Sequence, residues 1–255
     1  MWHARGMRVI PVPCLSDNYA YLIVPEGSSS AVVVDPSEDA PVRDALAREG
    51  LSLSEIWLTH HHWDHVGGVE ALCDAFSPSV VAGSAYDREH ARIPRQTRGL
   101  SEGDTMELAG QRVELYDIPG HTLGAIAYVV VGNLFSGDTL FVAGCGRVFE
   151  GTMPMMKDSL AKLRDLPGDT RVWCGHEYTV KNLEYACTIE PDSAAIAAAL
   201  EEAESIRASG RPTVPGTIAR EREINPFLRF DVPAVANGRD PVTTFTALRE
   251  GKDRF

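Results

Sequence analysis

The chain has 255 residues, 44% of them hydrophobic, and its 36 acidic side chains outnumber its 24 basic ones to give a net charge of −12. This length and hydrophobic content suffice for a buried core in one large or two small domains. The acidic balance argues against a nucleic-acid partner, because phosphate binding needs a clustered cationic face. No run reaches the ~18 consecutive apolar residues that would span a bilayer.

The cysteines are odd in number, widely spaced and free of any Cys-x-x-Cys pair; they are Cys14, Cys73, Cys145, Cys174 and Cys187. This usage is typical of reduced cytosolic thiols. Residues 1–5 show no apolar signal core. We therefore expect a cytoplasmic protein without a membrane partner, and we expect it to be a monomer.

In the first third of the chain, β-branched or aromatic-rich runs between turn residues predict strands at 7–12, 18–24 and 31–34. A helix is predicted over 41–49, where Val42 and Leu46 share a face and Gly50 follows. A strand at 54–59 delivers a histidine cluster at its C-terminal end, where ligand-binding loops of α/β sheets usually lie. Gly67-Gly68 permits a tight turn into a helix over 69–76.

Further strands are predicted at 79–82, 105–108, 112–118 and 126–131, the last forming a hairpin with 133–135 across Gly132. Strands interspersed with helices indicate layered sheets covered by helices on their outer faces. The last third is helical in pattern, with helices predicted over 180–187, 193–209, 217–224 and 242–251. Ser193, Thr217 and Asp240 are suitable N-terminal caps.

The segment 59–65 reads Thr-His-His-His-Trp-Asp-His and predicts a metal site. Imidazole and carboxylate groups suit zinc, iron or manganese, and crowding them without a cation would be costly. In an extended loop, His60 and His62 project to one side and His61 to the other, where it supports the loop. Asp64 and His65 would lie about 7–13 Å further along, which favours a second metal.

Three later candidates each follow a glycine at or just past a strand end; they are His121, Asp138 and His176. Glycine lets the backbone bend sharply and approach a site closely, so the repetition suggests convergence on one place. With the first cluster they make five histidines and two carboxylates. Seven ligand side chains suit two metal ions that share one ligand.

The order His60-x-His62-x-Asp64-His65, His121, Asp138, His176 resembles the metallo-β-lactamase superfamily. Within it, the chain resembles the glyoxalase II (hydroxyacylglutathione hydrolase) family from end to end. The similarity includes Asp17-Asn18-Tyr19, the segments 137–147 and 174–179, Asn225-Pro226-Phe227 and the segment 240–244. The ligand motif is common to the superfamily, whereas the later segments are specific to the family.

The resemblance implies an α/β fold, an αββα sandwich forming a catalytic domain over 1–176, followed by a small all-helical glutathione-binding domain over 177–255. It assigns His60, His62 and His121 to one divalent metal, Asp64, His65 and His176 to a second, and Asp138 to both. Zinc is the expected metal, with iron or manganese as alternatives. For glutathione the resemblance implicates Arg147, Tyr178, Arg249 and Lys252. Phe149 stands where many members have tyrosine, so one hydroxyl contact is missing.

The implied reaction is hydrolysis of S-(2-hydroxyacyl)glutathione thioesters, typically S-D-lactoylglutathione to glutathione and D-lactate, in methylglyoxal detoxification. Two metals about 3.5–4 Å apart can bind hydroxide at neutral pH, and this metal-bound hydroxide is the expected nucleophile. Asp138 is the catalytic residue as the bridge between the metals rather than as a proton donor. The thiolate leaving group, with a thiol pKa near ~8.5, needs little protonation. Cys145 is expected to be a packing thiol rather than a nucleophile.

Arg249 and Lys252 lie at i and i+3 and would form a basic pocket for the glutathione carboxylates. The alternative for this pair is a solvated helix end, where cations favour the helix dipole. Two other functions compete: a glutathione persulfide dioxygenase of the same superfamily with a single iron, and a metal-dependent binding protein without turnover.

Overall fold

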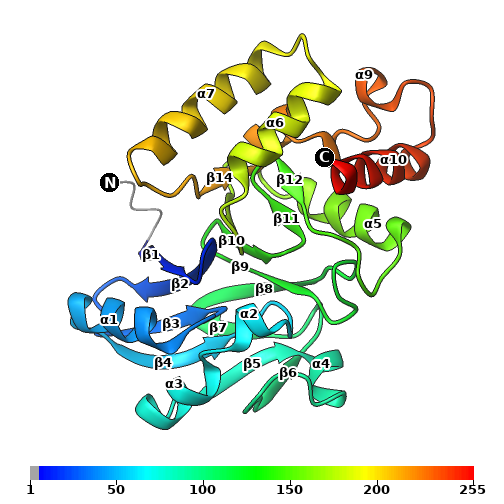
Figure 1. Cartoon of the computed structure of the whole chain (residues 1–255). Coiled ribbons are helices and arrows are strands. Elements are labelled where there is room, and N and C mark those ends of the chain that lie inside the picture. The colour runs from blue at the N-terminus through cyan, green and yellow to red at the C-terminus, as the bar shows by residue number, and fades with distance from the viewer. Residues whose placement is uncertain (1–5) are drawn as a thin grey trace. The chain divides into compact units, whose positions relative to one another are not determined.

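The structure is a computed structural model that describes residues 6–255, and the chain forms two compact units (Figure 1). Unit 1 comprises the described residues up to Asp117 together with Gly124–Gly137. Unit 2 comprises Ile118–Leu123 and Asp138–Phe255. The expectation for residues 1–5 lies outside the described part.

Unit 1 contains two sheets. The first has the strand order β1-β2-β3-β4-β5-β6, antiparallel from β1 to β3 and parallel from β3 to β6. Its strands are β1 (Met7–Cys14), β2 (Asn18–Pro25), β3 (Ser30–Val34), β4 (Ser52–Trp57), β5 (Val80–Ser84) and β6 (Arg98–Leu100). The second sheet is antiparallel and consists in this unit of β7 (Met106–Leu108), β8 (Gln111–Asp117), β9 (Ile126–Val130) and β10 (Asn133–Gly137).

Aromatic side chains join the two sheets of unit 1. Trp57 stacks on Tyr128 with ring centroids 5.1 Å apart, and Tyr21 lies 5.7 Å from Phe135. The buried Tyr128 hydroxyl donates to the Leu58 carbonyl at 3.0 Å, so its burial leaves no unsatisfied donor. The two sheets therefore face each other across a shared core.

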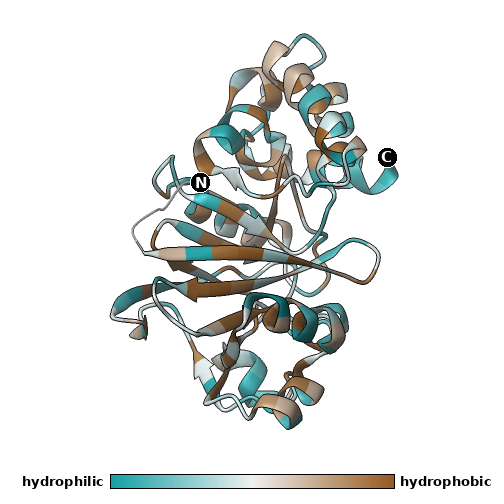
Figure 2. Ribbon diagram, turned by 90° about the vertical axis from the view of Figure 1, so that its left-hand side faces the viewer, coloured by the Kyte–Doolittle hydropathy of each residue, from teal (hydrophilic) through white to brown (hydrophobic). Residues whose placement is uncertain are grey.

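The helices of unit 1 are α1 (Asp39–Glu49), α2 (Trp63–Val66), α3 (Val69–Phe76) and α4 (Ala85–Glu89). Leu46 of α1 and Leu72 of α3 are almost fully buried in one cluster with Ile56 of β4. Burying such a side chain contributes about 1.5–3 kcal/mol. The predicted layering of helices on sheets is thus confirmed for this unit, and Figure 2 shows largely apolar strands beside helices with polar outer turns.

Unit 2 is mainly helical. Its helices are α5 (Met153–Arg164), α6 (Thr179–Ile189), α7 (Ala194–Ala208), α8 (Ile218–Ile224), η1 (Pro226–Leu228), α9 (Pro233–Ala236) and α10 (Pro241–Arg254), and its short strands are β11 (Leu140–Phe141), β12 (Gly144–Cys145), β13 (Arg171–Cys174) and β14 (Gly216–Thr217). A core of Leu183, Ile196, Ala203 and Ile224 joins α6, α7 and α8. None of the described helices is long and apolar enough to cross a membrane.

Most predicted elements are confirmed within two or three residues. Ser193, Thr217 and Asp240 each accept a hydrogen bond from a backbone N–H of the first turn, as capping predicts. Gly50 ends α1 in the left-handed conformation with φ 65°. Helix α5 was not predicted from the sequence, although Thr152 caps it and Met156, Leu160 and Leu163 form its buried face.

Candidate metal centre

The histidine loop of unit 1 curls instead of running on as a strand. β4 ends at Trp57, two residues before the predicted end, and 63–66 form the helical turn α2. The His65 N–H donates to the His62 carbonyl at 2.9 Å. The ring of His65 consequently lies 4.1 Å from the ring of His60. The separation of about 7–13 Å, which holds only for an extended chain, therefore does not apply to Asp64 and His65, because the turn folds the segment back on itself.

The division of the three consecutive histidines is as predicted. His60 Nε2 and His62 Nδ1 lie 3.2 Å apart, so these two rings present nitrogen atoms to one place. His61 Nδ1 instead lies 3.4 Å from Asp87 Oδ1, a fully buried carboxylate of α4. His61 thus supports the loop.

Asp35, which the sequence analysis missed, holds this loop. It is almost fully buried and follows β3 with φ 48°. Its Oδ1 accepts the Thr59 N–H at 2.8 Å, and its Oδ2 accepts the Thr59 hydroxyl at 2.6 Å. His65 Nδ1 lies 3.0 Å from the same Oδ2, which fixes the tautomer that offers Nε2 as a ligand atom. With both oxygens engaged in this way, Asp35 is better suited to orient His65 than to bind a metal itself.

Asn18 and two glycines complete the support of the loop. Asn18 Nδ2 donates to the Asp64 carbonyl at 3.0 Å and to Asp64 Oδ2 at 3.1 Å. A Cβ at Gly67 would lie 2.5 Å from the Ser37 carbonyl oxygen, and one at Gly68 would lie 2.7 Å from the backbone of Glu38. These glycines are required by close backbone approach rather than by a left-handed turn, because both have helical dihedral angles.

In unit 2, His121, Asp138 and His176 come together although they are far apart in the sequence. Asp138 Oδ2 lies 3.1 Å from His176 Nε2 and 3.6 Å from His121 Nε2. All three residues are buried. His121 Nδ1 lies 2.8 Å from the Arg147 carbonyl and donates to it, so Nε2 is the nitrogen that faces Asp138. The predicted convergence of these three residues is confirmed within this unit.

Backbone geometry positions Asp138. Gly137, the last residue of β10, has φ 48°, a conformation that favours glycine. A Cβ at Gly146 would collide with the Asp138 carbonyl oxygen. The segment 138–147 therefore folds back tightly on itself, and a side chain at Gly146 would force the backbone of Asp138 to shift.

Two buried amides and a buried acid hold the same segment. Asn182 Nδ2 donates to the Val142 carbonyl and Asn225 Nδ2 to the Gly144 carbonyl, both at 3.0 Å. Glu221 Oε2 accepts the Ala143 N–H at 2.8 Å. Helices α6 and α8 thus fix the loop that follows Asp138.

The four residues implicated in glutathione binding all belong to unit 2. Tyr178 stacks on His176 with ring centroids 4.7 Å apart and an interplanar angle of 4°. Arg147 is exposed, and its Nε lies 3.0 Å from Asp253 Oδ1. Lys252 Nζ donates to the Lys181 carbonyl at 2.6 Å. Burial, aided by the neighbouring Arg249, lowers the pKa of Lys252 to about 8.

Arg249 differs from the other three because it is buried. Its Nη1 donates to the Cys145 carbonyl at 2.7 Å, and its Nη2 lies 3.2 Å from Asp253 Oδ1. Cys145 is buried beside it, and burial raises the pKa of its thiol to about 11. A thiol with so high a pKa carries little thiolate at neutral pH, which supports the predicted packing role. All five cysteines are free.

Phe149 lies at the edge of the unit 2 site. Its side chain is 62% exposed, and its ring centroid is 5.3 Å from that of His121. An exposed aromatic ring against a candidate metal ligand offers an apolar contact but no hydrogen bond.

Comparison with known proteins decides the family. The sequence model of the metallo-beta-lactamase superfamily matches residues 16–176, and that of the hydroxyacylglutathione hydrolase C-terminus matches residues 177–255. The hydroxyacylglutathione hydrolase of Synechococcus sp. (strain JA-2-3B'a(2-13)) is 48% identical over 254 residues, which cover 98% of this chain and 100% of the relative. The chain belongs to the hydroxyacylglutathione hydrolase family.

Solved structures agree with the metallo-beta-lactamase fold. The crystal structure of ETHE1 from Myxococcus xanthus is 26% identical, with a TM-score of 0.68 over 95% of this chain and 89% of that chain. The crystal structure of TTHA1623 in a di-iron-bound form is also 26% identical, with a TM-score of 0.58 over 87% of this chain and all of that one. The predicted fold class, a metallo-β-lactamase domain followed by a helical domain, is confirmed for this member of the hydroxyacylglutathione hydrolase family.

Proposed function

We propose that the protein hydrolyses S-(2-hydroxyacyl)glutathione thioesters, with S-D-lactoylglutathione as the typical substrate and glutathione and D-lactate as products. The observation that carries the proposal is the similarity at 48% identity to a hydroxyacylglutathione hydrolase along 98% of the chain. The match of residues 177–255 to the C-terminal region of these hydrolases supports glutathione as the carrier of the acyl group. This activity would serve methylglyoxal detoxification.

We propose that seven residues hold two divalent metal ions. His60, His62 and His121 would bind one ion and Asp64, His65 and His176 the other, with Asp138 shared between them. Nitrogen and carboxylate oxygen donors of this kind suit zinc, the expected metal, and the di-iron form of a similar structure keeps iron as an alternative along with manganese. When bound, the two ions supply an activated water and a Lewis acid for the thioester carbonyl.

The chain's own residues prepare this centre in both units. Asp35 orients His65 through Nδ1, and the Arg147 carbonyl orients His121 in the same way. Fixing one ring nitrogen sets the direction of the other and raises its basicity as a ligand. Asp138 has its carboxylate oxygen within 3.6 Å of two imidazole nitrogens, which suits a carboxylate shared by two ions. We assign it no proton transfer, because a thiolate leaves without one.

For the glutathione moiety we propose contacts from Arg147, Tyr178 and Lys252. Arg249 would act by holding the backbone at Cys145 and by sharing Asp253 with Arg147. Its buried guanidinium would also place positive charge beside Lys252, which favours the substrate carboxylates. The catalytic domain would span 1–176 and the glutathione-binding domain 177–255.

The experiment that tests the proposal compares two reactions of the purified, metal-loaded protein. Hydrolysis is followed by loss of the thioester of S-D-lactoylglutathione, and the competing persulfide dioxygenase activity by oxygen consumption with glutathione persulfide. Elemental analysis of the same sample gives the metal content. Thioester hydrolysis with two ions per chain supports the proposal, whereas oxygen consumption with one iron, or metal binding without turnover, contradicts it. Light scattering would test the proposed monomer.

A further inference from the structure

The carboxylate of Asp253 in α10 lies between two arginines of unit 2. Its Oδ1 is 3.0 Å from Arg147 Nε and 3.2 Å from Arg249 Nη2. The neighbouring Lys252 adds a third cation, whose charge interacts with that of Arg249. These four side chains, called here the Asp253 cluster, combine three cations with a single acid.

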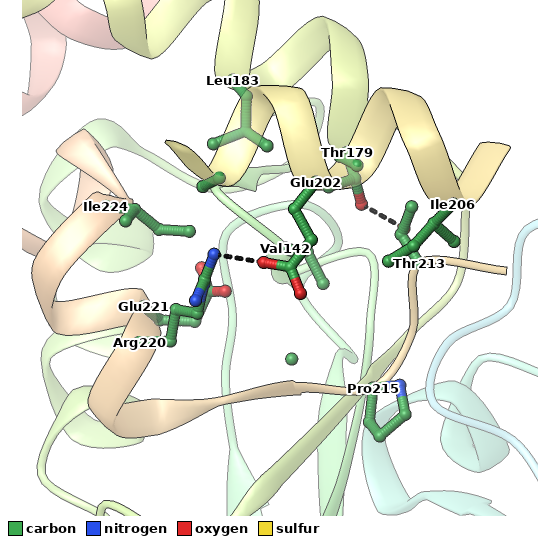
Figure 3. Close-up of a pocket in the computed structure, with 13 residues that line it drawn as sticks. Val142, Thr179, Leu183, Glu202, Ile206, Thr213, Pro215, Arg220, Glu221 and Ile224 are labelled. Atoms are coloured by element: carbon green, nitrogen blue, oxygen red, sulfur yellow. Dashed lines mark hydrogen bonds and ion pairs between the residues drawn. The ribbon is translucent and has the colours of Figure 1, made fainter. Parts of the chain in front are cut away.

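Other ion pairs of unit 2 match one cation with one acid. Glu202 and Arg220 lie 2.6 Å apart in the wall of a pocket between α6, α7 and α8 (Figure 3). Glu190 and Arg229 likewise pair at 2.7 Å. Such pairs cancel their charges, whereas the Asp253 cluster keeps an excess of positive charge and suits an anionic ligand.

Asp253 does little for the stability of α10 itself. It lies in the last turn of the helix, where the helix dipole favours cations over acids. Its i,i+4 pair with Arg249 has the cation on the N-terminal side, which is the less favourable order. The Asp253 side chain is 38% exposed, and ion pairs that water can reach contribute little to the free energy of unfolding. The position of this acid is therefore better explained by its partners than by its helix.

The two arginines differ in how firmly they are held. Arg249 is buried, donates to the Cys145 carbonyl at 2.7 Å and has its guanidinium carbon 5.2 Å from the centre of the Phe227 ring. The Arg147 side chain is 60% exposed, and its ion pair with Asp253 restrains it. A long arginine side chain has considerable rotamer freedom unless a partner fixes it. Arg249 thus anchors Asp253, and Asp253 in turn restrains Arg147.

This restraint suits the recognition of a second carboxylate. Arg147 faces Asp253 through Nε, so its two Nη groups can serve a ligand, and a guanidinium binds a carboxylate well through two parallel N–H bonds. A side chain that is already oriented loses less freedom when the ligand binds, which raises affinity.

We propose that Asp253 is a positioning residue, which orients Arg147 to receive a carboxylate of the glutathione moiety. This inference rests on the proposed function and adds to it a residue that acts through another. Because Asp253 would act through Arg147, it should affect affinity for the carrier of the acyl group and not the chemical step.

The test is steady-state hydrolysis of S-D-lactoylglutathione by the full-length, metal-loaded protein. S-methylglutathione, which has no scissile thioester, serves as inhibitor, and its inhibition constant measures affinity for the carrier. Asp253→Asn removes the charge at constant size, and Arg147→Ala removes the residue that Asp253 would orient. The matched control is Glu250→Gln, an exposed acid of the same helix that lies 4.0 Å from Arg254.

We expect Asp253→Asn to raise KM and the inhibition constant about three- to tenfold while kcat stays within about twofold of the parent. Arg147→Ala should raise both constants at least as much. Adding Asp253→Asn to Arg147→Ala should change them by less than about twofold, because the two residues act as one unit. Glu250→Gln should match the parent.

Several results would overturn the inference. An unchanged KM and inhibition constant in Asp253→Asn would do so, and lower constants would mean that Asp253 competes with the substrate for Arg147. Additive effects of the two substitutions, or a fall in kcat alone, would also contradict it. So would failure of Asp253→Asn to fold, because the inference gives this residue no part in stability. If the parent hydrolyses no thioester, the proposed function fails and the inference with it, whereas hydrolysis with equal constants defeats the inference alone.

Discussion

In each unit a buried carboxylate supports a segment that carries candidate metal ligands. The carboxylate lies 24 residues from its backbone partner in unit 1 and 78 residues from it in unit 2. In unit 1, Asp35 accepts the Thr59 N–H directly beside His60 and also contacts the ring of His65. In unit 2, Glu221 accepts the Ala143 N–H and touches none of His121, Asp138 and His176 through any described hydrogen bond. Asp35 therefore orients a ligand, whereas Glu221 fixes a fold of the backbone. Perturbing each unit in turn should reveal this difference.

The largest effect is expected for Asp138→Ala. In unit 2 a single carboxylate oxygen faces two imidazole nitrogens, so its removal should weaken the binding of both proposed ions and leave their mutual repulsion uncompensated. We expect hydrolysis to fall about 10³-fold or more, beyond the 10–100-fold typical of a lost supporting contact. Elemental analysis and kcat/KM measure this, with Asp104→Ala as an exposed control. Two ions per chain in an inactive variant would contradict the shared-ligand assignment.

The second effect concerns Arg249 and Lys252 of α10. Replacing both with alanine removes the charge-assisted contact proposed for Lys252, worth roughly 1.5–3 kcal/mol, together with the positive charge and the backbone support that Arg249 supplies, so kcat/KM for a glutathione thioester should fall on the order of 10²-fold. Arg249 and Lys252 each donate a hydrogen bond to a backbone carbonyl, but only Arg249 is buried, so Arg249→Ala alone should lower Tm more than Lys252→Ala does. Metal content should stay at the parent level.

The control for this pair is a small thioester without the glutathione carboxylates. It should be hydrolysed equally by parent and double variant, since neither can use the deleted contacts. A parallel loss of activity toward both substrates, or no loss toward either, would show that α10 does not recognise glutathione.

The sequence predicted those features that depend on near neighbours. α3 is confirmed at both ends because its apolar face and the preceding Gly68 lie within one short segment. The ligand residues were identifiable because histidine at such density has few other uses. Asp35 and Glu221 were missed, because each is a single acid whose role depends on partners 24 and 78 residues away. In sequence, Glu221 stands between Arg220 and Arg222 and resembles a residue on the solvated face of a helix.

The third prediction is a pH dependence of stability that originates in unit 2. Burial raises the pKa of Glu221 from 4.5 to about 7, so the folded state keeps this proton after the unfolded state has lost it. Stability from this group is complete below about pH 4.5 and is lost as pH rises through 7, by about 3 kcal/mol in all. Glu221→Gln should abolish this loss, measured as the difference in unfolding free energy from the parent between pH 5 and pH 8. If the unfolding free energy of Glu221→Gln changes with pH as much as that of the parent, the prediction is contradicted. The control is Glu204→Gln, an exposed glutamate whose replacement should leave the pH dependence as in the parent.

The fourth prediction tests the support in unit 1. Asp35→Asn retains the size of the side chain and suits φ 48°, so the fold should persist. An amide can accept only through its single oxygen, so it cannot serve both the Thr59 groups and His65 Nδ1 as the carboxylate does. We expect metal affinity to fall about 10–100-fold, measured by competition with a chelator. Unchanged affinity would mean that His65 needs no orienting partner.

The smallest effect is expected for Cys145→Ser. Burial raises the pKa of this thiol to about 11 although the neighbouring Arg249 lowers it, so little of the nucleophilic thiolate is expected at neutral pH. Serine is smaller and keeps a polar hydrogen. Arg249 Nη1 lies 3.6 Å from the sulfur but donates its short hydrogen bond, at 2.7 Å, to the Cys145 backbone carbonyl, which the substitution does not remove. Hydrolysis should therefore stay within about threefold of the parent, and a drop of about 10³-fold with intact metal content and folding would instead favour covalent catalysis at this cysteine. If Arg249→Ala lowers Tm while Cys145→Ser retains hydrolysis, the two results together would show that the backbone at Cys145, which α10 holds in place, matters to the protein, whereas the Cys145 side chain only packs.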